Sequence, residues 1–229
     1  AHAGSMKRVL VPGMSAMLPA GGRGSKKAHH ILASALDAIC EAPAARWDSH
    51  GDNFEDVTIR RLRHGGYLLG AQLFDHTFFG VPSAEASVMN PLQRLLLENS
   101  YGSLHTSGLG KADVLGTGTG VFVGCWSGDY NRVLDRGPKR HSIYALSADA
   151  AAVMVGRVSF LLGLQGPCTS MDTACSASLV AWHSALRAVQ LAESETSLVG
   201  GVNMMFTTSF GALMALAGML TMAACNQAP

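Results

Sequence analysis

The sequence predicts a layered α/β fold built around a mostly parallel β-sheet. Strand-like and helix-like segments alternate along the 229 residues, and this alternation is typical of a parallel sheet covered by helices. Hydrophobic residues make up 48% of the chain and charged residues only 14%, whereas about a quarter of the residues in an ordinary domain are charged. The composition therefore predicts a chain that buries more surface than a solitary domain of this length.

Five elements are expected in the N-terminal part, from hydrophobic periodicity and turn residues. They are a strand at residues 7–12, a helix at about 28–40, a strand-like segment at 67–70, a helix at 83–88 and a helix at 90–105. Residues 1–6 precede the first strand and are interpreted as a processing remnant or leader.

The C-terminal part continues the alternation. We expect a strand at 119–126, a helix at 145–162, a strand at 168–173, a helix from about 175, a strand at 198–206 and a helix at about 209–217. The turn before the strand at 168–173 is marked by Gly163, Gly166 and Pro167. The helix after residue 175 is predicted to bury one apolar face, formed at helical spacing by Leu179, Trp182, Leu186 and Val189.

Residues 196–229 carry no charge, which raises the question of a membrane span because about 20 apolar residues cross a bilayer. A membrane anchor at 197–224 is therefore one hypothesis. Polar residues and glycines interrupt the stretch, however, among them Asn203 and Thr207. We expect a buried strand, a polar bend and a helix here, and no membrane as a partner.

Cys175 is the candidate nucleophile. It lies in the run MDTACSAS (171–178), where a short strand turns directly into a helix, which is the layout of a nucleophile elbow. A helix that starts near Cys175 would stabilise a thiolate through its unpaired N–H groups and its dipole. Asp172 and Thr173 are expected to fix the bend by hydrogen bonding, and the small residues Ala174 and Ser176 complete the supporting set. The competing interpretation is a buried structural cysteine, the commonest setting for a free thiol.

Composition excludes several other classes of function. The five cysteines, at 40, 125, 168, 175 and 225, include no CxxC pair, and the nine histidines include no HExxH, so we expect no disulfide scaffold, no metal and no tightly bound cofactor. This cysteine usage favours a reducing intracellular compartment, cytoplasm or plastid. A net charge of +1 without a long basic run argues against nucleic acid. The glycine-rich run at 115–124 leads into a strand, so we interpret it as a turn and not as a phosphate loop.

The segment GPCTSMDTACSASLVAWHSAL resembles the active-site segment of β-ketoacyl synthases, the ketosynthase domains of polyketide and fatty acid synthases. VLVPGMSAMLPAGG (9–22), the segment 73–104, TGVFVGCWSGDY (119–130), VGRVSFLLGLQGP (155–167) and the segment 200–220 follow in that family's order. The resemblance covers residues 7–225. It implies the thiolase-like fold, in which two similar halves pack around central helices. This chain would be the first, cysteine-bearing half, with Cys175 opening a buried central helix.

The resemblance also implies an acyltransferase. In this family a cysteine takes an acyl group from the phosphopantetheine arm of an acyl carrier protein, and two histidines of the second half assist decarboxylative Claisen condensation in polyketide or fatty acid biosynthesis. Neither the HGTGT nor the NxGH motif that carries these histidines occurs here, and by the resemblance the family continues at this point into the last strand of its first half. Acyl transfer onto Cys175 is conceivable with these residues, with its own N–H as one oxyanion donor, whereas condensation is not. A complementary C-terminal half or larger assembly, and a homodimer, are the implied partners.

Two departures from the family pattern concern local hydrogen bonds. Asn90 stands where the family usually has Asp, and Leu92 stands where it has Gln, whereas Arg94 and Glu98 remain spaced to pair along a helix. His183 follows Cys175 by eight residues, too far to touch the thiol, and is expected to be a packed helix histidine. The alternative to an active half-synthase is a catalytically inactive, ketosynthase-derived structural subunit of a larger assembly.

Overall fold

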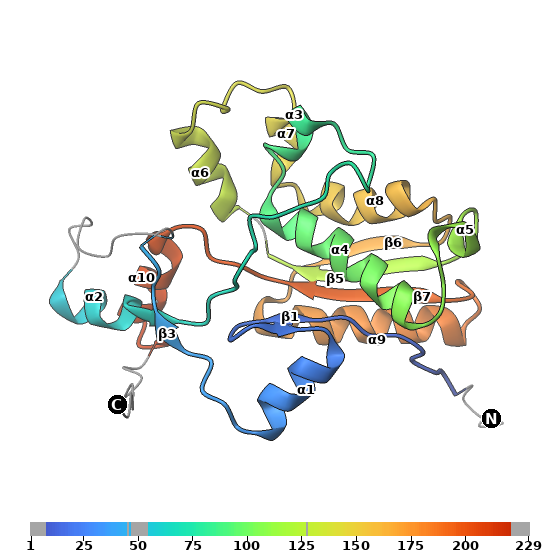
Figure 1. The fold of residues 1–229 in the computed structure, drawn as a ribbon, viewed down its shortest axis with the longest axis horizontal. Helices are drawn as coiled ribbons and strands as arrows, with labels where there is room; N and C mark the ends of the chain where they lie inside the picture. The colour runs from blue at the N-terminus through green and yellow to red at the C-terminus, as the bar shows by residue number, and fades with distance from the viewer. Residues whose placement is uncertain (1–7, 45, 47–54, 127, 221–229) are drawn as a thin grey trace.

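The computed structural model describes residues 8–44, 46, 55–126 and 128–220 (Figure 1). Its N-terminal elements are β1 (Met17–Leu18), β2 (Gly22–Arg23), α1 (Ser25–Ala33), β3 (Cys40–Glu41), α2 (Asp56–Leu62), β4 (His64–Gly65), α3 (Ser83–Ala86), α4 (Pro91–Thr106) and α5 (Lys111–Val114). Then follow β5 (Gly120–Cys125), α6 (Asp129–Arg136), α7 (Ala145–Ala148), α8 (Ala151–Leu162), β6 (Cys168–Met171), a 3₁₀ turn (Ala174–Ser176), α9 (Ala177–Gln190), β7 (Ser197–Val202) and α10 (Thr208–Leu216).

The central sheet is parallel, in the order β6-β5-β7. Gly124 of β5 lies opposite Met171 of β6 and Gly201 of β7, so all three strands end at the same edge. Two short antiparallel pairs, β1 with β2 and β3 with β4, lie outside this sheet. The predicted layered α/β fold with a mostly parallel sheet is confirmed.

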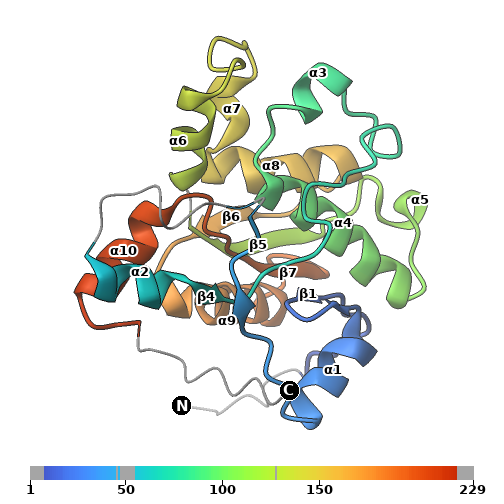
Figure 2. The ribbon, with the colours of Figure 1, turned by 60° about the vertical axis from the view of Figure 1, so that its left-hand side comes forward.

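Helices cover both faces of the sheet (Figures 1 and 2). α4 and α8 pack on one face, where Val121 and Val123 of β5 join the main core with buried residues such as Leu92 and Met154. α9 packs on the other face, against Phe122. Because successive side chains of β5 point to opposite faces and both faces are covered, every residue of this strand is buried.

Several elements lie where the sequence predicts them. α3, α4, β5, β6 and α10 match their expected ranges to within a few residues, and β7 forms the first part of the strand expected at 198–206. The expected turn at the glycine-rich run is also present, because residues 116–119 form no helix or strand and lead directly into β5.

Three predictions in the N-terminal part are wrong. Residues 8–12 form no strand, and Leu10 is 86% exposed, because no described segment pairs with them. The first helix is α1, which ends well before residue 40 and is followed by Ala35 in the left-handed region, with φ of 50°. Residues 67–70 form a loop, and the strand nearby is β4 at His64–Gly65.

The single helix expected at 145–162 is two helices, α7 and α8. Ala150 between them is extended, with ψ of 122°. The buried Asp149 carboxylate accepts hydrogen bonds from Gly128 N and Asn131 N at 2.9 and 3.2 Å. These bonds to distant residues stabilise the interruption between α7 and α8, and helical periodicity alone does not reveal them.

The predicted apolar face of α9 is not the face that packs on the sheet. Leu179 is 72% exposed and Trp182 is 48% exposed, so the central helix is buried on one side only. Its buried face consists of four small residues, Ala177, Ala181, Ala185 and Ala188. Large side chains at these positions would hold the helix away from the strands, so the close approach selects alanine.

In the ranges that the structure describes, no helix is long and apolar enough to cross a bilayer. The helix within the uncharged C-terminal stretch is α10, whose nine residues span about 14 Å at 1.5 Å per residue. A bilayer core is about 30 Å thick. The part of the membrane-anchor hypothesis that falls on residues 221–224 lies outside the described residues.

Candidate active site

Cys175 lies at the carboxyl edge of the sheet, between β6 and α9. β6 ends at Met171, the 3₁₀ turn contains Cys175, and α9 begins two residues after it. The cysteine is exposed. The predicted strand–bend–helix is therefore present, and the competing interpretation of a buried structural cysteine is wrong at this position. Ligand sites of parallel sheets characteristically form at this edge.

The four supporting residues shape the bend. Asp172 Oδ1 accepts a hydrogen bond from Ala174 N at 3.1 Å. Ser176 Oγ lies 2.8 Å from Thr173 O and 2.9 Å from Thr173 Oγ1. Ala174 adopts the left-handed conformation, with φ of 53°, which costs a non-glycine residue about 1 kcal/mol or more. Side-chain hydrogen bonds thus hold a strained backbone directly before the cysteine.

Two glycines that the sequence analysis did not single out allow α9 to start against the sheet. A Cβ added to Gly124 of β5 would lie 2.4 Å from Ala177 C and from Ser178 N. A Cβ added to Gly201 of β7 would lie 2.7 Å from Ser178 Cβ. Glycines at these two strand positions let the backbone of the helix start come close to both strands, which also fixes the position of the preceding turn.

Cys125, at the end of β5, is a second thiol beside the elbow. It is 3% exposed and packs in the main core. Burial, and secondarily the nearby Asp172 carboxylate, raise the pKa of the Cys125 thiol above its ordinary value. A neutral buried thiol is a packing group, so of these two cysteines only the exposed one is placed to meet a substrate.

A small pocket opens at the same edge, and the sequence analysis missed it. It has a volume of about 70 Å³ and is lined by Trp126, Gly128, Asp129, Arg132, Phe210 and Leu213. The rings of Trp126 and Phe210 lie 4.6 Å apart. These two residues are 84 positions apart in the chain, so no local pattern predicts their contact.

Asp129 joins the two loops that form this pocket. Its side chain is buried and accepts hydrogen bonds from Phe206 N at 2.7 Å, Thr207 N at 2.9 Å and Thr207 Oγ1 at 2.5 Å. The carboxylate thereby satisfies the backbone donors of the two residues that immediately precede α10. The β5–α6 and β7–α10 connections are fixed to each other next to the elbow.

Asn90 retains a capping role despite the departure from the family pattern. Its side chain caps α4 by accepting from Leu92 N at 2.8 Å, and its amide donates to Asp149 Oδ1 at 2.6 Å. Arg94 donates to the Met89 carbonyl at 2.7 Å, and no ion pair with Glu98 occurs among the described residues. The spacing that would allow an Arg94–Glu98 pair is thus not used by the described side chains.

Other candidate groups lie outside this arrangement. His183 is exposed, so the expectation of a packed helix histidine is wrong in this chain. Among the described residues, no cluster of three or more His, Cys, Asp or Glu side chains could hold a metal ion. The chemistry that the described geometry can offer is nucleophilic attack by the Cys175 sulfur.

Sequence comparison identifies relatives among polyketide synthases. The model of the β-ketoacyl synthase N-terminal domain matches residues 6–228. The pikromycin polyketide synthase component PikAII of Streptomyces venezuelae is 39% identical over 205 residues, which are 88% of this chain and 6% of that protein. The polyketide synthase GfsA of Streptomyces halstedii is 40% identical over 202 residues, which are 86% of this chain and 3% of that protein. The chain thus spans a small fraction of these relatives.

Structure comparison agrees. The ketosynthase from module 6 of the bacillaene synthase of Bacillus subtilis 168 superposes with a TM-score of 0.78 at 30% identity, covering 92% of this chain and 34% of that one. The oxazolomycin ketosynthase domain OzmH KS7 of Streptomyces albus JA3453 gives a TM-score of 0.82 at 28% identity, covering 93% of this chain and 38% of that one. Sequence and fold point the same way: the chain belongs to the β-ketoacyl synthase family, whose N-terminal domain and thiolase-like fold it carries.

Proposed function

We propose that this chain supplies the acyl-accepting cysteine of a β-ketoacyl synthase that takes part in polyketide assembly. The observation that carries the proposal is the exposed Cys175 at the strained bend between β6 and α9. The membership of the family and the polyketide synthases among its relatives support the reaction class.

The proposed step is a thioester exchange. The Cys175 sulfur attacks the carbonyl carbon of an acyl group held on the phosphopantetheine thiol of an acyl carrier protein. A C–S bond to Cys175 forms and the C–S bond to the carrier breaks, and the carrier thiol leaves with the proton that Cys175 gives up. The N–H of Cys175 is the proposed oxyanion donor in the tetrahedral intermediate. Asp172 and Thr173 act as positioning residues through the bonds that hold the bend.

Condensation requires groups beyond these residues. The histidines that the family resemblance implies for decarboxylative Claisen condensation have no counterpart motif in the 229 residues. We therefore assign acyl transfer to this chain, and condensation to its combination with a complementary half within a larger assembly. The exposed apolar side of α9, with Leu179 and Trp182, supports a covering partner.

Acyl loading tests the proposal. The chain is incubated with an acyl carrier protein whose acyl group is radiolabelled. The label retained on the chain is compared for wild type, Cys175→Ala and Cys168→Ala. Cys168 is the matched control, because it is also exposed and lies on the strand that leads to the elbow. We expect wild type and Cys168→Ala to be labelled equally and Cys175→Ala to stay unlabelled. Absence of label on the wild type, even with its native partners present, would favour the inactive structural role.

A further inference from the structure

The pocket beside the elbow has an apolar wall formed by two segments that are distant in the sequence. Trp126 directly follows β5, and Phe210 lies in the first turn of α10, with an angle of 36° between the two ring planes. Leu213, one turn further along α10, extends this wall. Among the polar lining residues, Arg132 is exposed, and the Asp129 carboxylate is already bound by backbone N–H groups. The pocket therefore offers a ligand mainly apolar contact.

The register of the sheet relates this wall to Cys175. Side chains of β5 alternate between the two faces of the sheet, and the positions of Phe122 and Gly124 face α9. Trp126 is the next position of this alternation, so it lies on the side where α9 begins. The parallel pairing of β5 with β6 places Trp126 level with Thr173, which begins the turn that contains Cys175. An acyl group attached to the Cys175 sulfur therefore starts beside the pocket.

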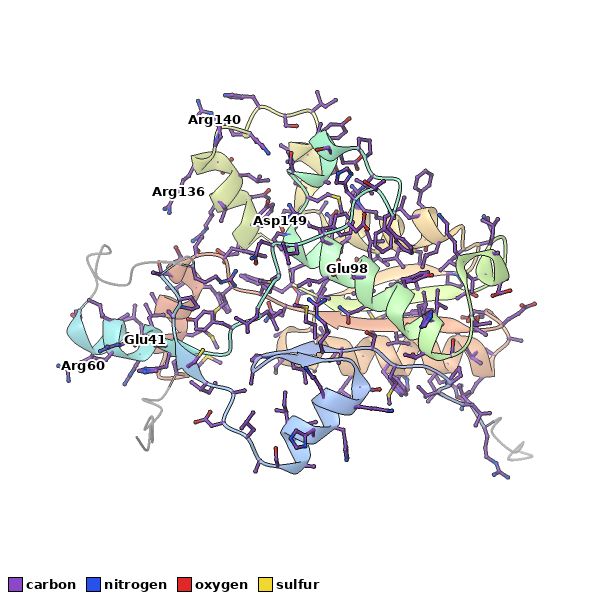
Figure 3. The ribbon with its side chains drawn as sticks, viewed as in Figure 1. Glu41, Arg60, Glu98, Arg136, Arg140 and Asp149 are labelled. Atoms are coloured by element: carbon purple, nitrogen blue, oxygen red, sulfur yellow. The ribbon has the colours of Figure 1, made fainter. Side chains whose placement is uncertain are left out.

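Two buried carboxylates hold the wall in place. Asp149 accepts hydrogen bonds from two N–H groups at the start of α6, at 2.9 and 3.2 Å, and Figure 3 shows Asp149 beside this end of the helix. Asp129 accepts from the two N–H groups that immediately precede α10, at 2.7 and 2.9 Å. The segments that carry Trp126 and Phe210 are thereby fixed to each other. A wall that is held in this way excludes groups larger than the pocket.

The volume of the pocket sets the size of the group that it can take. The pocket measures about 70 Å³. An apolar cavity of about 150 Å³ binds benzene, so roughly half that volume has room for about three carbon atoms. With the carbonyl carbon that is bonded to the sulfur, this corresponds to an acyl group of about four carbon atoms. A longer chain would have to displace the ring of Trp126 or Phe210.

We propose that Trp126 and Phe210 limit the acyl group that Cys175 accepts to short chains, of up to about four carbon atoms. The inference rests on the proposed function and names the class of acyl group and the two residues that select it. One methylene more or less in an apolar pocket changes selection by roughly tenfold or more. Removal of either ring should therefore change the chain-length preference of the protein.

A competition between two acyl groups tests this selection. The protein is exposed to an equimolar mixture of propionyl and octanoyl N-acetylcysteamine thioesters, and intact-protein mass spectrometry measures the two adducts, with Cys175→Ala as the background. The ratio of octanoyl to propionyl adduct does not depend on how much of a variant is folded, because both adducts form on the same folded molecules. The variants are Trp126→Ala, Phe210→Ala and the control Phe160→Ala. Phe160 is 83% exposed on α8, which ends at the opposite edge of the sheet, where β6 begins.

We expect the wild type to take propionyl in preference to octanoyl. Trp126→Ala and Phe210→Ala should each raise the ratio of octanoyl to propionyl adduct at least tenfold, and Phe160→Ala should keep the wild-type ratio. A wild type that prefers octanoyl, a ratio unchanged in both pocket variants, or an equal change in Phe160→Ala would overturn the proposal.

Trp126→Phe covers the case in which the alanine variants fail to fold. It keeps a smaller ring in the wall, so we expect a rise of the same ratio by a smaller factor than for alanine, and an unchanged ratio would again overturn the proposal. The proposed function has a separate readout in the same experiment. A wild type that forms neither adduct on Cys175, even with its native partners present, would refute the proposed function itself.

Discussion

Replacing Asn90 by Asp should place two buried carboxylates in contact. Asn90 is fully buried and Asp149 is 4% exposed, and the Asn90 amide nitrogen lies 2.6 Å from Asp149 Oδ1. In Asn90→Asp this donor becomes an oxygen. Two ionised carboxylates at that separation would repel by about 6 kcal/mol at an effective dielectric constant of about 20. Binding one proton to the pair costs less free energy than this repulsion. At pH 7 the cost is about 4 kcal/mol, because each pH unit above the ordinary Asp pKa of about 3.9 adds 1.36 kcal/mol.

The expected loss of stability therefore depends on pH. The proton is bound in the folded variant and released on unfolding, so the folded state binds more protons and its stability falls as pH rises above about 4. We expect Asn90→Asp to be less stable than wild type by about 4 kcal/mol at pH 7 and by about 1.5 kcal/mol at pH 5. Urea unfolding followed by tryptophan fluorescence measures both values.

The matched control is the double variant Asn90→Asp with Asp149→Asn, which restores one carboxylate and one amide to the pair. Its amide oxygen can still accept from Gly128 N and Asn131 N, as the carboxylate does in the wild type. We expect the double variant to recover most of the lost stability and the added pH dependence to vanish. A single variant whose deficit is the same at pH 5 and pH 7, or a double variant no more stable than the single one, would refute this reasoning.

Three further predictions concern the elbow and its surroundings. Gly124→Ala should lower the free energy of unfolding by about 3 kcal/mol because its Cβ meets the backbone of α9, whereas Gly118→Ala, with open space around the Cβ, should change it by less than about 0.5 kcal/mol in the same urea titration. Ala174→Gly should keep or raise stability because φ is 53° there, and Ala174→Val should cost at least about 1 kcal/mol by thermal unfolding; equal melting temperatures for the two would show that the bend is not strained. Burial raises the pKa of the Cys125 thiol, so the unfolded chain ionises first and stability should decline above about pH 8.5; Cys125→Ala should lessen that decline, and an unchanged slope would contradict the assignment.

The elements that sequence reasoning predicts best are those whose signal is local. A short, mostly apolar run that contains two glycines predicts the fully buried strand β5, and the turn residues before β6 lead directly to the Cys175 bend. The placement of the cysteine follows from its order between a strand and a helix. Because this order is local, the sequence alone predicts the candidate nucleophile and its four supporting residues.

The remainder depends on contacts between distant segments. The face of α9 that packs on the sheet is set by Gly124 and Gly201, which lie on two other elements. Helical periodicity of the larger apolar side chains therefore predicts the wrong face. The break between α7 and α8 depends on Asp149, whose partners lie at positions 90, 128 and 131. A strand at 8–12 needs a partner strand, and apolar composition does not supply one.

The most direct test of the central claim is to locate the acyl group on the protein after a brief exposure to the acylated carrier. Proteolysis and mass spectrometry of the peptides distinguish Cys175 from the two other exposed cysteines of the described chain, Cys40 and Cys168. The account predicts an acyl adduct on the peptide that contains Cys175, formed before any adduct on the other two. Adducts that accumulate at Cys40 or Cys168 as fast as at Cys175 would contradict it.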